Sequence, residues 1–299
     1  MSQKAKNKTL KKTLSTIIKI GVSVFCLYLV FTKIPLNIVW ERLEESNKCF
    51  LLLSTLALLL SQWLSALRLN VYFHTVSFNL SSKSNLILYF IGMFYNFFIP
   101  GGIGGDAYKV YVLHKQFDWN AKKLTAALFV DRFSGLTAIG VLLVILAFAF
   151  SNTELLPISL WVFRLLLGIV LMAIILVSWL FNRQFFPSFK AVFAKGLLFS
   201  LGIQSLQLLS IALLVYNYEA QDYLFAYLFV FLVSVVLSII SFAGIGIREY
   251  IFYKASAWLH YEAGTSVAIG LLFTFATALI SLIGVYYQFR KIPLGKATL

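Results

Sequence analysis

Residues 86–106 read LILYFIGMFYNFFIPGGIGGD, an apolar run that ends in a proline and a glycine-rich turn. The run from Leu86 to Ile99 would form a helix only about 21 Å long, at about 1.5 Å per residue. The hydrocarbon core of a bilayer is about 30 Å thick. Because proline and glycine end the helix before it can cross, this stretch predicts a hairpin that dips into a membrane and returns.

The composition of the whole chain supports a membrane setting. Of its 299 residues, 61% are hydrophobic and only 12% are charged, and the formal net charge is +14. Soluble domains carry about 25% charged residues, so a soluble fold and a disordered chain are both excluded. A nucleic-acid partner is not expected, because no folded basic surface is available to bind one. The charge asymmetry is better interpreted as membrane topology.

Seven further runs approach or exceed the roughly 20 residues that a crossing helix needs. They cover residues 14–32, 50–67, 124–150, 160–181, 197–217, 223–242 and 264–288. The first run follows five lysines, as in a signal peptide, but no small-residue cleavage pattern follows it. We therefore expect an uncleaved first span with a cytoplasmic tail.

The basic residues favour a returning hairpin at residues 86–99. The loop at 68–85 carries Arg68 and Lys83, and the stretch after the glycine-rich turn carries four lysines. Cytoplasmic loops are enriched in Lys and Arg. A full crossing would separate these two basic stretches, whereas a hairpin leaves both in the cytoplasm. Arg68 itself is explained by anchoring at the membrane interface.

The run at 223–242 precedes a second glycine turn, and we expect it to dip in from the opposite face. The C-terminal basic residues then return to the cytoplasm, and most acidic residues lie outside. These are Glu41, Glu44, Glu45, Glu154, Glu219, Asp222 and Glu262. The predicted fold is an all-α integral membrane protein of six crossings and two re-entrant hairpins, forming one domain over residues 1–299. Both termini would lie on the cytoplasmic side of the inner membrane. Because 223–242 is long enough to span, eight crossings are the alternative.

An internal repeat is consistent with this topology. A shift of 142 residues aligns Gly102-Ile103-Gly104 with Gly244-Ile245-Gly246, and Tyr108 and Tyr111 with Tyr250 and Tyr253. The halves would cover approximately residues 14–150 and 160–288. Two hairpins from opposite faces make these halves inverted repeats, a plan used by many transporters. Eight full crossings would make them parallel repeats, and chance identity of common residues is the other explanation.

Ionisable residues at membrane depth are costly, so each needs a reason. The glycine turn exposes backbone N–H groups that can hold an anion, with Asp106 and Lys109 close by; Asp106 as a plain helix N-cap is the alternative. Adjacent residues do not share a helix face, so Asp131 and Arg132 should each reach a separate partner, such as a residue of a hairpin. A structural ion pair that locks two helices is the alternative.

Arg248 and Glu249 directly follow the second glycine turn. An arginine can bind phosphate through two parallel hydrogen bonds, which makes Arg248 the main candidate for head-group contact; snorkelling to the interface is its alternative. The two hairpins would meet near the midplane and form one polar pocket. The histidines lack metal-ligand spacing, and no nucleotide or hydrolase motif is present. We expect no metal, no cofactor and no catalytic residue.

Three motifs in order resemble the flippase-like membrane domain of lysylphosphatidylglycerol synthases. They are NFFIPGGIGGD at 96–106, Asp131-Arg132 with Gly135, and GIGIRE at 244–249. Lys109 replaces an expected arginine, and Ile239 stands where a proline often precedes the second turn. The two-domain synthases add a soluble aminoacyl transferase domain, for which this chain has no room, so the resemblance implies lipid binding or translocation rather than lysyl transfer.

The expected function is translocation or binding of an anionic or aminoacylated phospholipid, or of a polyprenyl-phosphate lipid. The residues expected at the head group are Asn96, Gly102, Gly104, Gly105, Asp106, Lys109, Asp131, Arg132, Arg248 and Glu249. One alternative is a membrane enzyme that acts on such a lipid, with Asp106 or Glu249 as its base. Another is a non-catalytic partner of a separate synthase or transferase.

Overall fold

The computed structural model describes residues 36–98, 104–149, 159–238, 247–290 and 294–297. Within these ranges the chain is almost entirely helical, and the one strand-like pairing is an isolated bridge between Leu80 and Lys296. The helices are α2 (Leu36–Glu45), α3 (Lys48–Thr75), α4 (Ser82–Phe98), α5 (Gly104–Phe117), α6 (Ala121–Ala149), α7 (Leu160–Phe185), the 3₁₀ helix η2 (Pro187–Val192), α8 (Phe193–Asn217), the 3₁₀ helix η3 (Gln221–Tyr223), α9 (Leu224–Leu237), α10 (Ile247–Leu259), α11 (Ala263–Ser281) and α12 (Ile283–Arg290).

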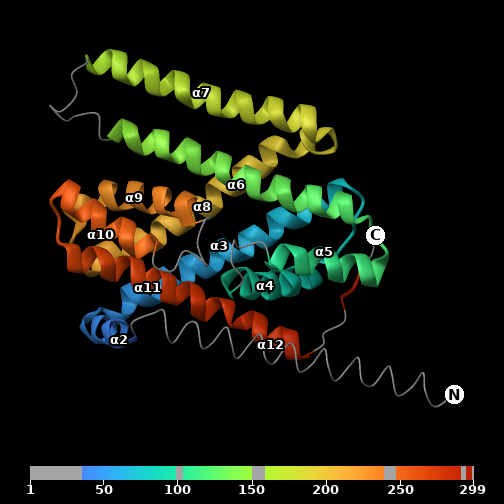
Figure 1. Cartoon of the computed structure of the whole chain (residues 1–299), viewed down its shortest axis with the longest axis horizontal. Helices are drawn as coiled ribbons and strands as arrows, with labels where there is room; N and C mark the ends of the chain where they lie inside the picture. Colours follow the sequence, from blue (N-terminus) through green and yellow to red (C-terminus); the bar gives the residue numbers. More distant parts are fainter. Residues whose placement is uncertain (1–35, 99–103, 150–158, 239–246, 291–293, 298–299) are drawn as a thin grey trace.

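Among the described residues, five helical stretches are long and apolar enough to cross a membrane. They are Lys48–Thr75, Ala121–Phe148, Leu160–Phe185, Pro187–Asn217 and Ala263–Arg290. These stretches run roughly along the longest axis of the molecule (Figure 1). The prediction of an all-α membrane protein is confirmed. The first expected span, residues 14–32, lies outside the described residues, so the number of crossings stays a prediction.

The first short apolar run forms a tight helical hairpin with the segment that follows it. Helices α4 and α5 pack so closely that a Cβ atom on Gly105 would collide with the backbone carbonyl of Gly92. Both outer ends of the hairpin reach the same C-terminal segment. The Gly295 amide donates to Ser84 Oγ over 2.8 Å, and Gln116 Nε2 donates to the Leu294 carbonyl over 3.0 Å. The hairpin therefore begins and ends at one end of the molecule, which we call the basic end.

The second hairpin begins and ends at the opposite end, which we call the acidic end. Helix α9 spans only 14 residues, about 21 Å at 1.5 Å per residue. The rings of Tyr223, before α9, and Tyr261, after α10, lie 5.5 Å apart. Figure 1 shows α9 and α10 at the left of the molecule, and α4 and α5 toward the right. The expected glycine turn at 244–246 and Ile239 lie outside the described residues.

Two long helices, α3 and α8, pack antiparallel through the middle of the fold. Near the acidic end the hydroxyls of Ser54 and Ser210 hydrogen-bond at 2.8 Å. Toward the basic end Arg68 Nη1 donates to Ser200 Oγ over 2.7 Å. Small hydroxyl residues allow such close approach between membrane helices and supply hydrogen bonds across the interface. This antiparallel pair joins the two halves of the chain and supports the site described next.

Helix α7 lies at the edge of the molecule beside α6 (Figure 1). The described residues of α7 that are buried, Ser178 and Asn182, are polar. Thr137 of α6 donates to Ser178 across this contact over 3.1 Å. Many apolar side chains of α7, among them Leu165, Met172 and Val177, are exposed, as expected for a helix with one face toward lipid.

Candidate functional site

A cavity of about 320 Å³ opens beside the first hairpin, between α3, α4, α5, α6 and α11. We call it the charged cavity, because five of the residues that line it are ionisable. The lining residues are Gln62, Arg68, Tyr89, Met93, Asn96, Phe97, Asp106, Lys109, Asp131, Arg132 and Thr277. Asp131 lies ten residues into α6 from its start at Ala121, a depth of about 15 Å along the helix. That depth is about half of a bilayer core.

One side of the charged cavity is held by an ion pair between α3 and α6. Arg68 Nε and Nη2 donate to the two carboxylate oxygens of Asp131 over 2.8 and 3.0 Å. Arg68 is only 7% exposed. The expectation that Arg68 merely anchors the interface is therefore wrong, because a carboxylate on a neighbouring helix pairs with it inside the fold. A buried pair of this geometry requires both members, since removing one leaves an uncompensated charge.

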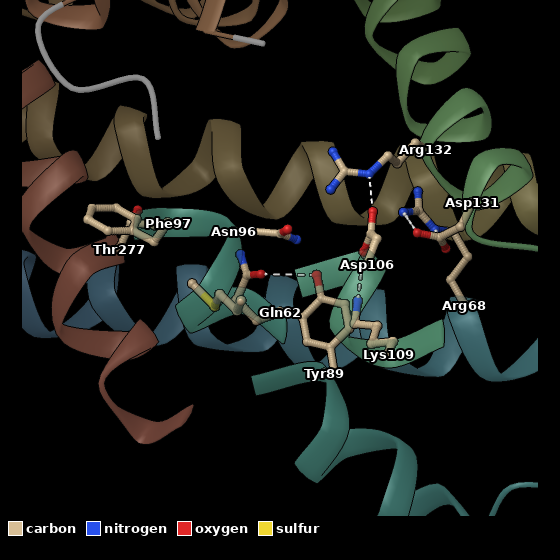
Figure 2. A pocket seen from close by; sticks show the side chains of 11 residues that line it. Gln62, Arg68, Tyr89, Asn96, Phe97, Asp106, Lys109, Asp131, Arg132 and Thr277 are labelled. Carbon is tan, nitrogen blue, oxygen red and sulfur yellow. Dashed lines mark hydrogen bonds and ion pairs between the residues drawn. The ribbon is translucent and has the colours of Figure 1, made fainter. Parts of the chain in front are cut away.

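The other side of the charged cavity is a carboxylate shared by two cations. Asp106 accepts from Lys109 Nζ over 3.2 Å and from Nε of Arg132. The adjacent residues Asp131 and Arg132 thus reach different partners, and Arg132 reaches across to a hairpin as expected (Figure 2). The Lys109 ammonium also lies 4.8 Å from the ring centre of Tyr89, a cation–π contact that helps to hold a charge away from water.

The start of α5 is capped from the end of α4. The Gly105 amide donates to Asn96 Oδ1 over 2.8 Å. Asp106 lies inside the first turn of α5, so the expectation that Asp106 is the N-cap is wrong and the side chain turns into the cavity instead. A negative charge in a first helical turn is favoured by the helix dipole. Gly104 begins the helix, and Gly102 lies outside the described residues.

Arg248 and Glu249 occupy a separate place in α10. Arg248 is buried, its Nη1 donates to Thr274 Oγ1 over 2.9 Å, and its guanidinium lies 4.8 Å from the Phe273 ring centre. Thr274 in turn donates to Glu249 Oε1 over 2.9 Å. Among the described residues, neither Arg248 nor Glu249 lines the charged cavity; because both glycine turns lie largely outside the described residues, the expected single pocket shared by both hairpins stays a prediction. Snorkelling of Arg248 is excluded, because Thr274 and aromatic rings hold it inside the fold.

Helix α11 connects the two places. Thr277 lines the charged cavity, and Thr274, one turn earlier, contacts both Arg248 and Glu249. The sequence reasoning missed Thr277, Tyr89 and Gln62. The Tyr89 hydroxyl donates to Gln62 Oε1 over 3.3 Å. A glutamine inside the apolar run at 50–67 is the signal that could have revealed this contact, because polar side chains in a span usually face the protein interior.

The chemistry available in the charged cavity is electrostatic. Three cations face two carboxylates, which leaves one net positive charge. The Arg132 side chain is 46% exposed and its guanidinium points into the cavity (Figure 2). Arginine and lysine side chains at this depth can bind a phosphate oxygen through charge-assisted hydrogen bonds. Among the described residues, no group of His, Cys, Asp and Glu is placed to hold a metal ion.

A comparison with known protein families identifies the family to which this chain belongs. The family model described as the lysylphosphatidylglycerol synthase TM region matches residues 16–284. The chain belongs to this family. A comparison with curated proteins gave no match. The chain is therefore a multi-pass membrane protein of the lysylphosphatidylglycerol synthase TM region family, and the family relates it to the handling of membrane lipids.

Proposed function

We propose that this protein binds the head group of an anionic or aminoacylated membrane lipid in the charged cavity and moves it across the cytoplasmic membrane. The observation that supports the proposal is the charged cavity itself, in which Arg132 and Lys109 both contact the Asp106 carboxylate. A lipid phosphate that enters would bind Arg132 or Lys109 and replace part of their interaction with Asp106. Polyprenyl phosphate presents the same chemistry.

The proposed topology has six crossings and two hairpins, with the basic end in the cytoplasm. Each described hairpin has both outer ends at one end of the molecule, and its helices are short for a full crossing. The positive-inside tendency assigns the basic end to the cytoplasm. In this arrangement the first hairpin enters from the cytoplasm, and the second hairpin enters from the outside.

We also propose that the halves are inverted repeats. The 142-residue shift pairs Asp106 with Arg248 and Arg132 with Thr274. The Asp106–Arg132 contact then corresponds to the Arg248–Thr274 contact. Gln62 and Gln204 are also paired, and both lie between the two hydrogen-bonded sites of the antiparallel α3–α8 pair. Rocking of such halves about a shared axis is a common route to alternating access.

The proposal is tested with the full chain in vesicles that contain a fluorescent phosphatidylglycerol, whose outer-leaflet signal is removed by a reductant. We expect wild-type protein to expose the inner-leaflet label faster than empty vesicles do. Arg132→Gln should slow the rate about tenfold, because a charge-assisted hydrogen bond to phosphate is lost.

Arg183→Gln is the matched control. Arg183 stacks on Trp179 in α7 and does not line the charged cavity, so its rate should stay within about twofold of wild type. Equal rates for wild type and empty vesicles would overturn translocation of this lipid. Movement that appears only after addition of a separate synthase would favour the partner role instead.

A further inference from the structure

A second cavity, of about 200 Å³, lies at the acidic end between the end of α8, the start of α9 and the turn that joins α10 to α11. We call it the tyrosine cavity. The residues that line it are Tyr218, Glu219, Ala220, Asp222, Tyr223, Tyr227, Tyr261, Glu262 and Thr265. Four tyrosines and three carboxylates therefore surround a space several times the volume of one water molecule, about 30 Å³.

The aromatic wall of the tyrosine cavity is continuous. The ring centre of Tyr261 lies 5.5 Å from that of Tyr223 and 4.6 Å from that of Tyr227. Tyr227 and Tyr261 are both buried, so their rings are held in place by the surrounding helices. The face of an aromatic ring is electronegative, and several such faces together bind ammonium groups.

The charge of the tyrosine cavity is uncompensated among the described residues that line it. Glu219, Asp222 and Glu262 contribute carboxylates, and no lysine or arginine lines the space. Thr265 donates a hydrogen bond to Glu262, which orients one carboxylate without neutralising it. An arrangement of rings and carboxylates with no cation of its own attracts a positive ligand.

A third observation concerns the hydroxyl of Tyr261. This hydroxyl is buried and makes no hydrogen bond of full geometry among the described residues; the Ser266 hydroxyl lies close to it but already donates to the Phe252 carbonyl. Tyr261 also lines the cavity. Leaving a buried polar atom unpaired is costly, so a ligand that supplies a partner is favoured. A primary ammonium has three N–H donors for the hydroxyl oxygen and the carboxylates, whereas a quaternary ammonium has none.

We propose that the tyrosine cavity binds the primary ammonium of a lipid head group, such as an aminoacyl or ethanolamine group. The identification of the ligand as a lipid rests on the proposed function. The assignment of an ammonium site to this cavity does not depend on it. In the proposed topology this cavity lies at the outer surface. A cationic head group would then be met there by carboxylates, while its phosphate stays at the membrane interface.

The test uses the full chain in phosphatidylglycerol nanodiscs and titration calorimetry with n-butylammonium and tetramethylammonium. We expect saturable binding of n-butylammonium. Tyr261→Phe keeps the ring and removes the unpaired hydroxyl, so it should weaken n-butylammonium about tenfold and leave tetramethylammonium within about twofold. A purely structural role for Tyr261 would not separate the two probes.

Asp222→Asn should weaken both probes by about three- to tenfold, because it removes a charge from the lining. Glu41→Gln is the matched control, since Glu41 is an exposed carboxylate of α2 that does not line the cavity. The control should bind both probes like wild type. Absence of saturable n-butylammonium binding, or wild-type binding by both cavity variants, would overturn the site.

The source of the ammonium is tested by adding phosphatidylethanolamine to the nanodiscs. If a lipid amine occupies the site, the apparent affinity for n-butylammonium should fall. An unchanged affinity would overturn the lipid source and assign the site to soluble amines. Transbilayer movement of phosphatidylglycerol, which has no amine, tests the proposed function separately: equal rates for wild type and empty vesicles would overturn that function and leave a measured n-butylammonium site standing.

Discussion

The two hairpins hold their buried charges in different ways. In the α4–α5 hairpin, charge is matched with charge, because Asp106 contacts Lys109 and Arg132, and Asp131 beside it pairs with Arg68. In the α9–α10 hairpin, Arg248 is held by the Thr274 hydroxyl and two phenylalanine rings. Among the described residues, the charged cavity opens beside the first hairpin's network and not beside Arg248. The difference favours the ionic network, which a ligand can rearrange, as the proposed phosphate site, and indicates hydroxyl and aromatic support for Arg248.

The largest expected effect on stability comes from the ion pair between Arg68 and Asp131, and it exceeds the effect of removing the Thr274 hydroxyl. Asp131→Ala should lower the free energy of unfolding by about 3–5 kcal/mol, because it leaves Arg68 charged and unpaired in the fold. Thr274→Val, in the second hairpin, should cost only about 1 kcal/mol. Both are measured by unfolding in mixed detergent. The double variant Arg68→Leu/Asp131→Leu should recover most of the loss, and a loss as large as that of Asp131→Ala would contradict the interpretation.

The next effect concerns the closeness of the two helices in the first hairpin. Gly105→Ala should destabilise the protein by about 1–3 kcal/mol, because its Cβ would collide with the Gly92 backbone. In the proposed repeat the 142-residue shift places Ile247 at the equivalent point of the second hairpin, so this glycine contact would be particular to the first. Gly168→Ala is the control, since a Cβ at Gly168 of α7 meets nothing within 4 Å. It should be neutral or slightly stabilising.

A smaller effect is expected at the cap between α4 and α5. Asn96→Ala removes the acceptor for the Gly105 amide and should lower stability by about 1 kcal/mol. It should also slow lipid movement more than its effect on stability implies, because α5 carries Asp106 and Lys109 into the cavity. Asn96→Asp keeps an acceptor, so recovery of stability there checks the capping role. Equal loss in both variants would argue against it.

The smallest effect on stability should come from removing Arg248, the buried charge of the second hairpin. Arg248→Met removes a buried guanidinium whose Nε has no hydrogen-bond partner among the described residues, and its long apolar side chain can fill similar space. We expect a stability change within about 1 kcal/mol, since buried charges often contribute little net stability. The rate of phosphatidylglycerol movement should change less than in Arg132→Gln. A larger loss of transport for Arg248→Met would reverse the ranking of the two hairpins.

Composition and run length were sufficient to predict the membrane class and the short helices. The apolar run at 86–99 and the proline after it indicated a hairpin. The length of a helix follows from the run and from the residue that ends it, so it can be predicted without knowing the tertiary contacts. The same reasoning anticipated separate partners for Asp131 and Arg132. These inferences depend on local geometry, which the sequence carries directly.

The partners themselves could not be predicted. Arg68 closes an apolar run, a position that also suits an interfacial anchor, and only the packing of α3 against α6 brings it to Asp131. Arg248 follows a glycine turn, as Asp106 does, yet Thr274 and two rings enclose it. Tyr261 is far along the chain from Tyr223 and Tyr227, and it meets them only because α9 and α10 fold back together. Such contacts depend on tertiary structure.

Helix α11 has a consequence for the energetics of the whole protein. Thr277 lines the charged cavity, and Thr274 contacts Arg248 and Glu249 from the same helix. A ligand that shifts α11 through Thr277 must also alter the contacts of Thr274. The two regions then share a coupling free energy, and linkage requires that a second ligand bound at Arg248 would change the affinity of the cavity by the same factor as the cavity ligand changes the affinity at Arg248. One helix would therefore couple the occupancy of the charged cavity to the contacts of Arg248 in the second hairpin.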